Sequence, residues 1–326
     1  MNLMRMYFPE LINHLVINAA EAVARRGGMS LNDLHEPEIT DALVTEFPTM
    51  VNNVIAPILD VRMGGCYIHQ KPKAHFININ GIQTSREIGD LLVVCRQTID
   101  GIETFNAAIF QMKMHDSDKS NHHITNTGEL EQLYLYQHWP VFDCYRNKVK
   151  TTFDLYPKSP IQGAQYALAS RVNSMFPLRI YHSMPASMMS LYADLTWGNF
   201  LQDFIINQKG CVITPRADKE EDEWSRLVWY LLDISWQSVY RLKRINRRNQ
   251  PRIGGDFFNL CNLITHADEV FSDIEHAGKG NNPFFGDNVE EEPEGLSLLL
   301  IDAGEDYTLR NPRFKDFSLN MKPLWY

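Results

Sequence analysis

The sequence predicts a mixed α/β fold, in which a mixed β-sheet is flanked by helices. Two β-rich runs, 91–95 and 107–113, enclose the pair Asp100-Gly101, which is the strongest short signal for a β-hairpin. Segments farther out on both sides, 35–47 and 129–139, carry apolar residues at helical spacing. A hydrophobic content of 44% supports a substantial core, and a charged content of 22% is ordinary for a globular protein.

Ahead of the hairpin, two helices are expected from their start and stop signals. The first covers 8–26 and stops at Gly27-Gly28. The second covers 35–47, where Pro37 suits the first turn and acids crowd the N-terminal end, as the helix dipole favours. Further predicted elements before the hairpin are a helix over 50–61, ended near Gly64-Gly65, and strands over 66–70 and 75–80.

Beyond the hairpin, helical and strand patterns continue to alternate, and a boundary near residue 215 is predicted. Residues 1–215 would form the core with its N-terminal helices, and 216–326 a helical C-terminal region with an acidic segment. The predicted elements are helices over 129–139, 197–206, 217–248 (the longest in the chain) and 257–274, strands over 148–155, 178–181 and 211–214, and a short strand or core-packing segment over 296–301.

The net charge of −9 is concentrated in one stretch of the chain. Residues 281–309 hold eight acids and no Lys or Arg, so removing those eight charges leaves −1 for the remainder. The acidity therefore argues little against a local basic groove elsewhere. A basic groove is predicted at the end of the long helix, where Arg241, Arg244 and Arg248 share a face that could follow phosphates, with Lys243 and Arg247 beside them. Matching of the helix dipole accounts for only some of these charges.

The five cysteines are scattered and form no CxxC motif, so neither a disulfide framework nor a zinc ribbon is predicted. A reducing cytoplasm is the expected location. No apolar run approaches the roughly 18 residues of a membrane span, so no membrane association is expected. No GxxxxGK[ST] loop occurs, so ATP hydrolysis would have to come from a companion protein.

A tight turn at Asp100-Gly101 predicts the register of the hairpin. Facing residues then have numbers that sum to 201, so Asp90 lies opposite Gln111, and Lys113 is one diagonal step away on the same face. A carboxylate, an amide oxygen and an ammonium group would meet at the open end of the hairpin. A slip of one residue would place Asp90 and Gln111 on opposite faces.

This set of side chains predicts a site for a hard divalent cation. Mg²⁺ prefers oxygen ligands and keeps several waters, so Asp90, the Gln111 amide oxygen and the backbone carbonyl of Met112 suit it. A lysine beside such an ion can orient or deprotonate water, or stabilise charge that develops on a phosphodiester. The sequence therefore points to phosphodiester hydrolysis with Mg²⁺ or Mn²⁺.

Gly89-Asp90, a spacer and then Gln111-Met112-Lys113 resemble the active-site hairpin of the PD-(D/E)xK nuclease superfamily, in the variant with Gln for the second acid. The resemblance covers roughly residues 35 to 140. It implies a restriction-endonuclease-like core, a helix packed on the sheet after the hairpin, and DNA cleavage in bacterial restriction or anti-phage defence. Two departures are that Gly89 replaces the usual Pro and that Gln111 is neutral.

The resemblance also implies a third carboxylate from a helix ahead of the hairpin. Glu38 is the first choice, beside the apolar stripe of the predicted helix, with Glu36 and Glu87 as alternatives. The simpler interpretation is that the acids of this helix only stabilise its N-terminus.

Two function classes follow. The first is a metal-dependent endodeoxyribonuclease with catalytic residues Asp90, Gln111, Lys113 and Glu38. By the same resemblance a companion ATPase or sensor would accompany it, and double-strand cutting usually needs two active sites, as in a homo-oligomer. The second is a non-catalytic subunit with a nuclease-like fold that binds nucleic acid or a protein partner.

Overall fold

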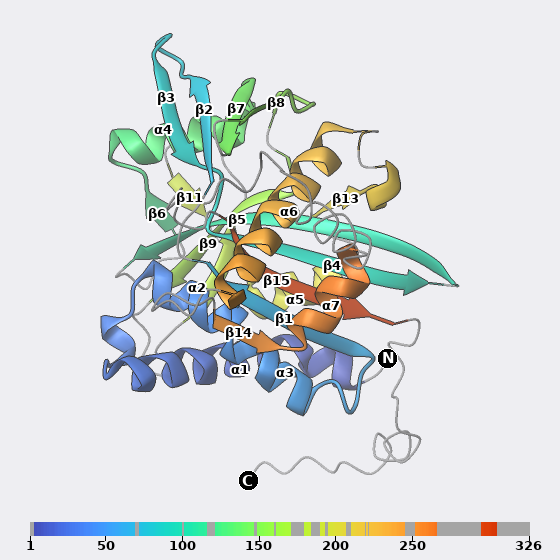
Figure 1. The fold of residues 1–326 in the computed structure, drawn as a ribbon. Helices are drawn as coiled ribbons and strands as arrows, with labels where there is room; N and C mark the ends of the chain where they lie inside the picture. The colour runs from blue at the N-terminus through green and yellow to red at the C-terminus, as the bar shows by residue number, and fades with distance from the viewer. Residues whose placement is uncertain are drawn as a thin grey trace.

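The computed structural model describes most of the chain. It covers residues 3–68, 72–99, 101–115, 121–146, 149–159, 161–170, 179–183, 190–192, 195–206, 210–218, 220, 222–244, 252–265 and 295–304. Its main body is a mixed β-sheet between two layers of helices, with a smaller sheet above one layer (Figure 1).

Helices form near the predicted positions, but several limits differ: the helix predicted over 35–47 is divided at Thr45 into two, and the long helix predicted from 217 begins at Glu223. The helices are α1 (Leu3–Gly27), α2 (Glu36–Val44), α3 (Glu46–Val54), α4 (Thr127–His138), α5 (Trp197–Ile206), α6 (Glu223–Arg244) and α7 (Phe257–Thr265), with 3₁₀ turns at Leu31–Asp33 and Arg216–Asp218. The prediction of a helix over 50–61 was wrong in its limits, because α3 ends at Val54 and a strand begins at Val61. Within the described residues, the predicted longest helix, α6, has 22 residues and α1 has 25.

Gly64 and Gly65 do not end a helix but lie inside strand β1 (Val61–Tyr67). A Cβ atom at Gly64 would meet the backbone of Phe257, and one at Gly65 would overlap the carbonyl oxygen of Val44. The two glycines were interpreted from the sequence as a helix stop. They are needed instead because α2 and α7 pack closely against this strand.

The main sheet contains nine of the described strands. Its order is β12-β10-β9-β5-β4-β15-β1-β14, and β13 also pairs with β5. The strands not yet given are β4 (Leu91–Ile99), β5 (Ile102–His115), β9 (Ala164–Ser170), β10 (Arg179–Ser183), β12 (Leu195–Thr196), β13 (Cys211–Ile213), β14 (Arg252–Gly255) and β15 (Ser297–Ala303). The hairpin β4–β5 is antiparallel, whereas β15 runs parallel to β4 and β9 runs parallel to β5. The predicted mixed sheet is confirmed.

The sheet continues across the predicted boundary at residue 215. Strand β15 lies between β4 and β1, and β14 pairs with β1. All seven residues of β15 are buried, as a continuous apolar run in the middle of a covered sheet requires. Among the described residues, the part after 215 is therefore not a separate helical unit, because it contributes a central strand and helix α6 to the common core.

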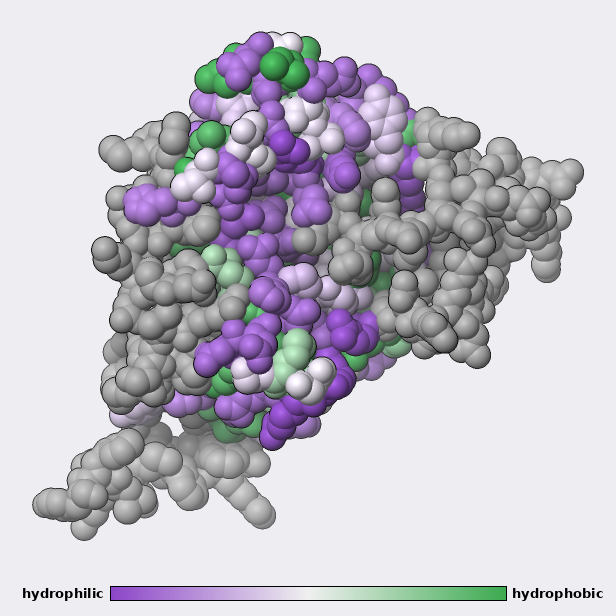
Figure 2. All heavy atoms as spheres, turned by 90° about the vertical axis from the view of Figure 1, so that its left-hand side faces the viewer, coloured by the Kyte–Doolittle hydropathy of each residue, from purple (hydrophilic) through white to green (hydrophobic). Residues whose placement is uncertain are grey.

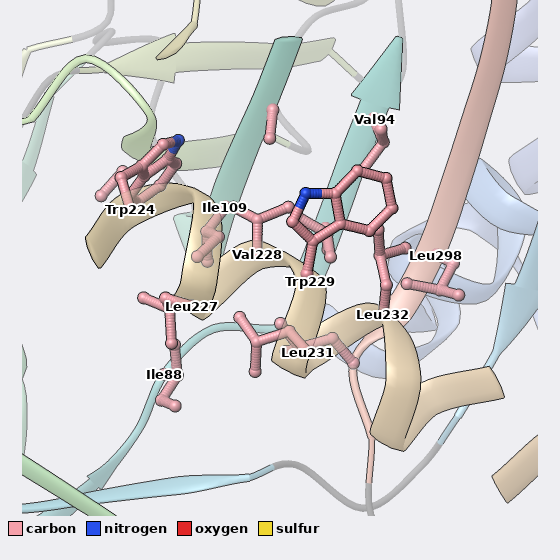
Figure 3. Packing of buried hydrophobic residues seen from close by; sticks show 14 of the residues in the cluster. Ile88, Val94, Ile109, Trp224, Leu227, Val228, Trp229, Leu231, Leu232 and Leu298 are labelled. Atoms are coloured by element: carbon pink, nitrogen blue, oxygen red, sulfur yellow. The ribbon is translucent and has the colours of Figure 1, made fainter. Parts of the chain in front are cut away.

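The two faces of the main sheet bury different helices. Helices α1, α2, α3 and α5 share one hydrophobic cluster with Leu91, Val93 and Phe110. Helices α4, α6 and α7 share the other with Leu92, Val94 and Ile109. Figure 3 shows Trp229 and Leu232 of α6 beside Val94 and Leu298 of the sheet. The hairpin is thus held from both sides.

The smaller sheet has the order β3-β2-β7-β8 and covers α4. Its strands are β2 (Lys73–Ile77), β3 (Gln83–Glu87), β7 (Phe142–Arg146) and β8 (Val149–Phe153), and a separate pair joins β6 (Asn121–His123) to β11 (Ser190–Tyr192). Phe76 of β2 stacks on Tyr134 of α4, with ring centroids 6.2 Å apart. Strand β3 leads directly through Ile88 and Gly89 to Asp90.

Within the described residues, none of the helices combines the length and the apolarity needed to cross a lipid bilayer.

Candidate functional site

The predicted register of the hairpin is confirmed. Ile99 pairs with Ile102 and Leu91 with Phe110, so facing residues sum to 201 along the whole hairpin. Gly101 has φ 74°, the left-handed conformation that a tight turn needs, while Asp100 lies outside the described residues. The paired register stops at Leu91 and Phe110, and Asp90 lies one residue before β4, where its side chain contacts that of Gln111.

The Asp90 side chain accepts the last hydrogen bond at the open end of the β4–β5 hairpin. Its backbone N–H donates to the Phe110 carbonyl at 2.8 Å, and its Oδ2 accepts from the Met112 N–H at 2.6 Å. The carboxylate thus replaces the next backbone carbonyl of β4 as acceptor. Gly89 permits this approach, because a Cβ there would come within 3.1 Å of the Phe110 carbonyl oxygen. Close packing explains why position 89 is Gly, whereas the nuclease motif that it resembles usually has Pro there.

Gln111 contacts Asp90 but retains an unused oxygen. Its Nε2 donates to Asp90 Oδ2, and only 5% of the residue is exposed. Its Oε1 is buried and has no hydrogen-bond partner. A buried acceptor without a partner in the protein is available to a water, an ion or a ligand, and leaving it unused would cost roughly 1–3 kcal/mol.

The acid that reaches the hairpin from α2 is Glu36, not Glu38. The Glu38 Oε2 accepts from the His35 N–H at 2.9 Å, which closes the N-terminus of its own helix. The Glu36 Oε1 instead accepts from the Met114 N–H of β5 at 3.2 Å. The third candidate, Glu87, lies in β3 opposite Lys73. The choice of Glu38 is therefore corrected in favour of Glu36.

Asp90 and Glu36 lie along the same edge of β5. The N–H groups of Met112 and Met114 point to the same side because the two residues are two apart in a strand, and their nitrogens are separated by roughly 6.6 Å. The Met112 carbonyl points to that side as well. Two carboxylates, one carbonyl and the Gln111 amide thus border the point where β4 ends.

Helix α4 places a second set of polar side chains opposite this edge. Lys113 is largely buried, with 16% of its side chain exposed, and its Nζ lies 3.9 Å from the Glu129 Oε1. Gln132 and Tyr136 follow Glu129 at three and seven residues, which brings all three to one face of the helix. The Gln132 Nε2 is buried and has no partner. The buried residues of this helix are Gln132, Leu133, Leu135 and Tyr136.

Two tyrosines complete the cluster, and neither was among the predicted site residues. Tyr136 donates from its hydroxyl to the Ile88 carbonyl at 2.6 Å, and its ring lies 5.5 Å from that of Tyr166 in β9. The Tyr166 hydroxyl is buried and has no partner. Burial raises the pKa of both phenols, and the negative charge of Asp90 adds to the effect on Tyr136. Both side chains therefore stay neutral and can donate hydrogen bonds.

The donor set suits a cation that takes few protein ligands. In the described part of the chain, no group of three or more His, Cys, Asp or Glu side chains could hold a metal ion. The Asp90 and Glu36 carboxylates, the Met112 carbonyl and the Gln111 Oε1 nevertheless provide hard oxygen donors at one strand end, which fits Mg²⁺ or Mn²⁺ with several retained waters.

The predicted nucleic-acid-binding cations lie at the C-terminal end of α6 and just beyond it. Arg241, Lys243 and Arg244 belong to the last turns of α6, but their side chains are not described. Arg247 and Arg248 are outside the described residues, as are 287–294 of the acidic segment. The basic groove stays a prediction.

No protein-family model, curated protein or solved structure matches the chain.

Proposed function

We propose that the protein is a metal-dependent endonuclease that hydrolyses DNA phosphodiester bonds. The observation that carries the proposal is the unpartnered Oε1 of buried Gln111 beside the Asp90 carboxylate, at the strand end where the Met112 carbonyl and Glu36 also lie. A group of hard oxygen donors at one strand end, one of them a buried and unused acceptor, favours a cation over a purely structural cap.

Asp90, Glu36, Gln111 and the Met112 carbonyl would hold Mg²⁺ or Mn²⁺. When bound, such an ion acidifies water and neutralises charge on a phosphodiester. Lys113 would stabilise the negative charge that develops on the phosphate and orient the attacking water, and Glu129 would hold the Lys113 ammonium in position. The neutral phenol of Tyr166 supplies a further donor on the same side.

The order of elements supports the same proposal. Helix α4 follows the hairpin and packs on its sheet, and β9 then pairs parallel to β5. This order is compatible with the restriction-endonuclease-like core implied by the resemblance of Gly89-Asp90 and Gln111-Met112-Lys113. The setting that we propose is bacterial restriction or anti-phage defence, with DNA as substrate and a companion ATPase or sensor as partner.

Cleavage of supercoiled plasmid with MgCl₂ or MnCl₂ tests the proposal. Wild type should nick or linearise the plasmid, and Lys113→Ala should reduce the rate by about 100-fold or more, since removal of one charge-stabilising group typically costs that much. The matched control is Lys150→Ala, because Lys150 lies in the smaller sheet and pairs with Asp143 at 2.9 Å. Equal rates for wild type and Lys113→Ala, at unchanged urea midpoints, would refute the assigned role of Lys113.

A non-catalytic subunit is the second candidate, and one observation favours it. Asp90 is only 1% exposed and already accepts two hydrogen bonds, so it would serve well as a structural cap for the strand end. In that case no metal would change the stability of the protein, and plasmid would stay intact with every variant.

A further inference from the structure

The tip of the β2–β3 hairpin exposes three isoleucines on a segment without charge. Ile77, Ile79 and Ile82 are 61%, 76% and 61% exposed. Residues 74–85 contain no Asp, Glu, Lys or Arg. Figure 1 shows this hairpin projecting from the body of the molecule, and hydrophobic side chains gather at the corresponding upper end in Figure 2. Apolar side chains grouped at a projecting tip mark a contact site.

The tip is held rigid by its own hydrogen bonds. The buried Asn78 side chain accepts from the N–H groups of Asn80 and Ile82, at 3.0 and 3.1 Å. The Gly81 N–H donates to the Asn78 carbonyl at 2.9 Å, and Gly81 has φ 74°, which a residue with a Cβ would rarely adopt. The exposed isoleucines are thus displayed on a fixed turn.

A second set of hydrogen bonds ties the tip to helix α4. Glu131 accepts from the Asn78 Nδ2 at 2.8 Å and from the Thr84 hydroxyl at 2.9 Å, and it forms an ion pair with Arg86. Burial alone would raise the pKa of Glu131, but the hydrogen bonds and the Arg86 guanidinium outweigh burial and lower it. The tip is therefore braced on the helix that also carries Glu129, Gln132 and Tyr136.

The size and the edges of the smaller sheet argue against a protein partner at this tip. Three isoleucine side chains provide far less than the roughly 800 Å² per partner of a stable protein interface. Carbonyls on both outer strands are already used, since Arg86 donates to the Ser85 carbonyl and Arg226 to the Thr152 carbonyl. Strand addition from another chain is thus disfavoured.

We propose that this tip inserts into the minor groove of duplex DNA and partly unstacks a base step with Ile79 and Ile82. The inference rests on the proposed function, and it names how that function would grip its substrate. Apolar wedges together with Asn and Gln side chains are what minor-groove proteins use, and Asn80 and Gln83 flank the isoleucines here. A tip without acids meets the phosphates without repulsion.

The chain links the tip to the candidate site over a short distance. Ile82 and Asp90 are eight residues apart in sequence, so they are separated by at most about 26 Å at 3.3 Å per residue. That span corresponds to roughly eight base pairs at 3.4 Å each. The unstacked step should therefore lie within about eight base pairs of the bond that is cut.

Binding of the full chain to short duplexes, in EDTA so that nothing is cut, tests the proposal. The double variant Ile79→Asn/Ile82→Asn should bind at least about tenfold more weakly, since two aliphatic side chains are lost from the contact. The slope of log K against log salt should stay unchanged, because no phosphate contact is removed. Fluorescence of 2-aminopurine at a TA step should rise with wild type and not with the variant.

Two controls separate the wedge from a general effect on folding. Val212→Asn removes a side chain that is 59% exposed on β13, outside the smaller sheet, and should bind as wild type does. Ile79→Leu/Ile82→Leu keeps the apolar wedge and should restore both binding and fluorescence. Equal affinity and fluorescence for wild type and the Asn variant would overturn the inference, as would a wild-type protein that binds no duplex. A protein that unstacks DNA through the tip but never cuts it would support this inference and refute the nuclease.

Discussion

The substitution Gln111→Glu distinguishes a cation site from a structural cap. In the wild-type protein the Gln111 Nε2 donates to Asp90 Oδ2, and both residues are buried. A carboxyl at position 111 cannot donate to Asp90 unless it is protonated. The variant therefore places either two adjacent negative charges or one shared proton at the end of β4.

The cost of this change follows from the two alternatives. Two ionised carboxylates about 3 Å apart repel by about 5.5 kcal/mol at an effective dielectric constant of 20. Protonating one carboxyl of ordinary pKa 4.3 at pH 7 costs about 3.7 kcal/mol. The protonated form is cheaper and restores the hydrogen bond, so the free energy of unfolding should fall by about 3–4 kcal/mol at pH 7.

The pH dependence has a definite sign. The new carboxyl would have a raised pKa in the folded state, so its contribution is most favourable below the unfolded pKa and is lost as pH rises. The deficit should therefore shrink by about 1.4 kcal/mol per pH unit between pH 7 and pH 4.5.

Urea unfolding with and without MnCl₂ then separates the two interpretations. A cation between the carboxylates removes their repulsion, and metal at about a thousand times its Kd adds about 4.1 kcal/mol to the folded state. The deficit of Gln111→Glu should thus disappear with MnCl₂. The matched control is Gln165→Glu, because Gln165 is equally buried, its Nε2 donates to the Gln162 carbonyl at 2.6 Å, and its Oε1 also has no partner. A Gln111→Glu deficit that MnCl₂ leaves unchanged, as in the control, would refute the cation site.

Two further predictions concern residues around the site. Tyr166→Phe removes a buried hydroxyl that has no partner and keeps the ring beside Tyr136. Urea unfolding should therefore show a free energy of unfolding that is unchanged or raised by up to about 1 kcal/mol, while metal-dependent cleavage falls about tenfold. A large loss of stability would show that the hydroxyl is structural. Glu131→Gln should destabilise the protein by about 1.5–3 kcal/mol at pH 7 through its charged hydrogen bonds. Because the pKa of Glu131 is lowered from 4.5 in the folded state, this difference should shrink as pH falls below 4.5 and be lost once pH lies below the lowered pKa; a difference that does not shrink below pH 4.5 in thermal melts would contradict this account.

The hairpin could be predicted from the sequence because its determinants are local. Asp100-Gly101 and the apolar runs on either side predict the register from Leu91 to Phe110, so the contact of Asp90 with Gln111 at the open end was expected without knowledge of the rest of the chain. The limits of α5 and α4 were predictable for the same reason, since spacing and caps lie within a few residues of each helix end.

The choice between Glu36 and Glu38 depended on tertiary structure. Both lie in the first turn of α2, and only the angle at which the helix meets β5 decides which carboxylate reaches the Met114 N–H. Tyr166 could not be found for a similar reason, because its place beside Gln111 comes from the pairing of β5 with β9, more than fifty residues apart in sequence.

The sequence by itself determined the hairpin, its register and the chemical character of the residues at its open end, because neighbours along the chain specify these. Only the tertiary structure decided that β15 enters the sheet between β1 and β4, which joins the C-terminal part to the core. A continuous apolar run such as Leu298–Ile301 indicates that a segment is buried, but it does not indicate between which two strands the segment lies. That position is set by long-range packing, which no local pattern encodes.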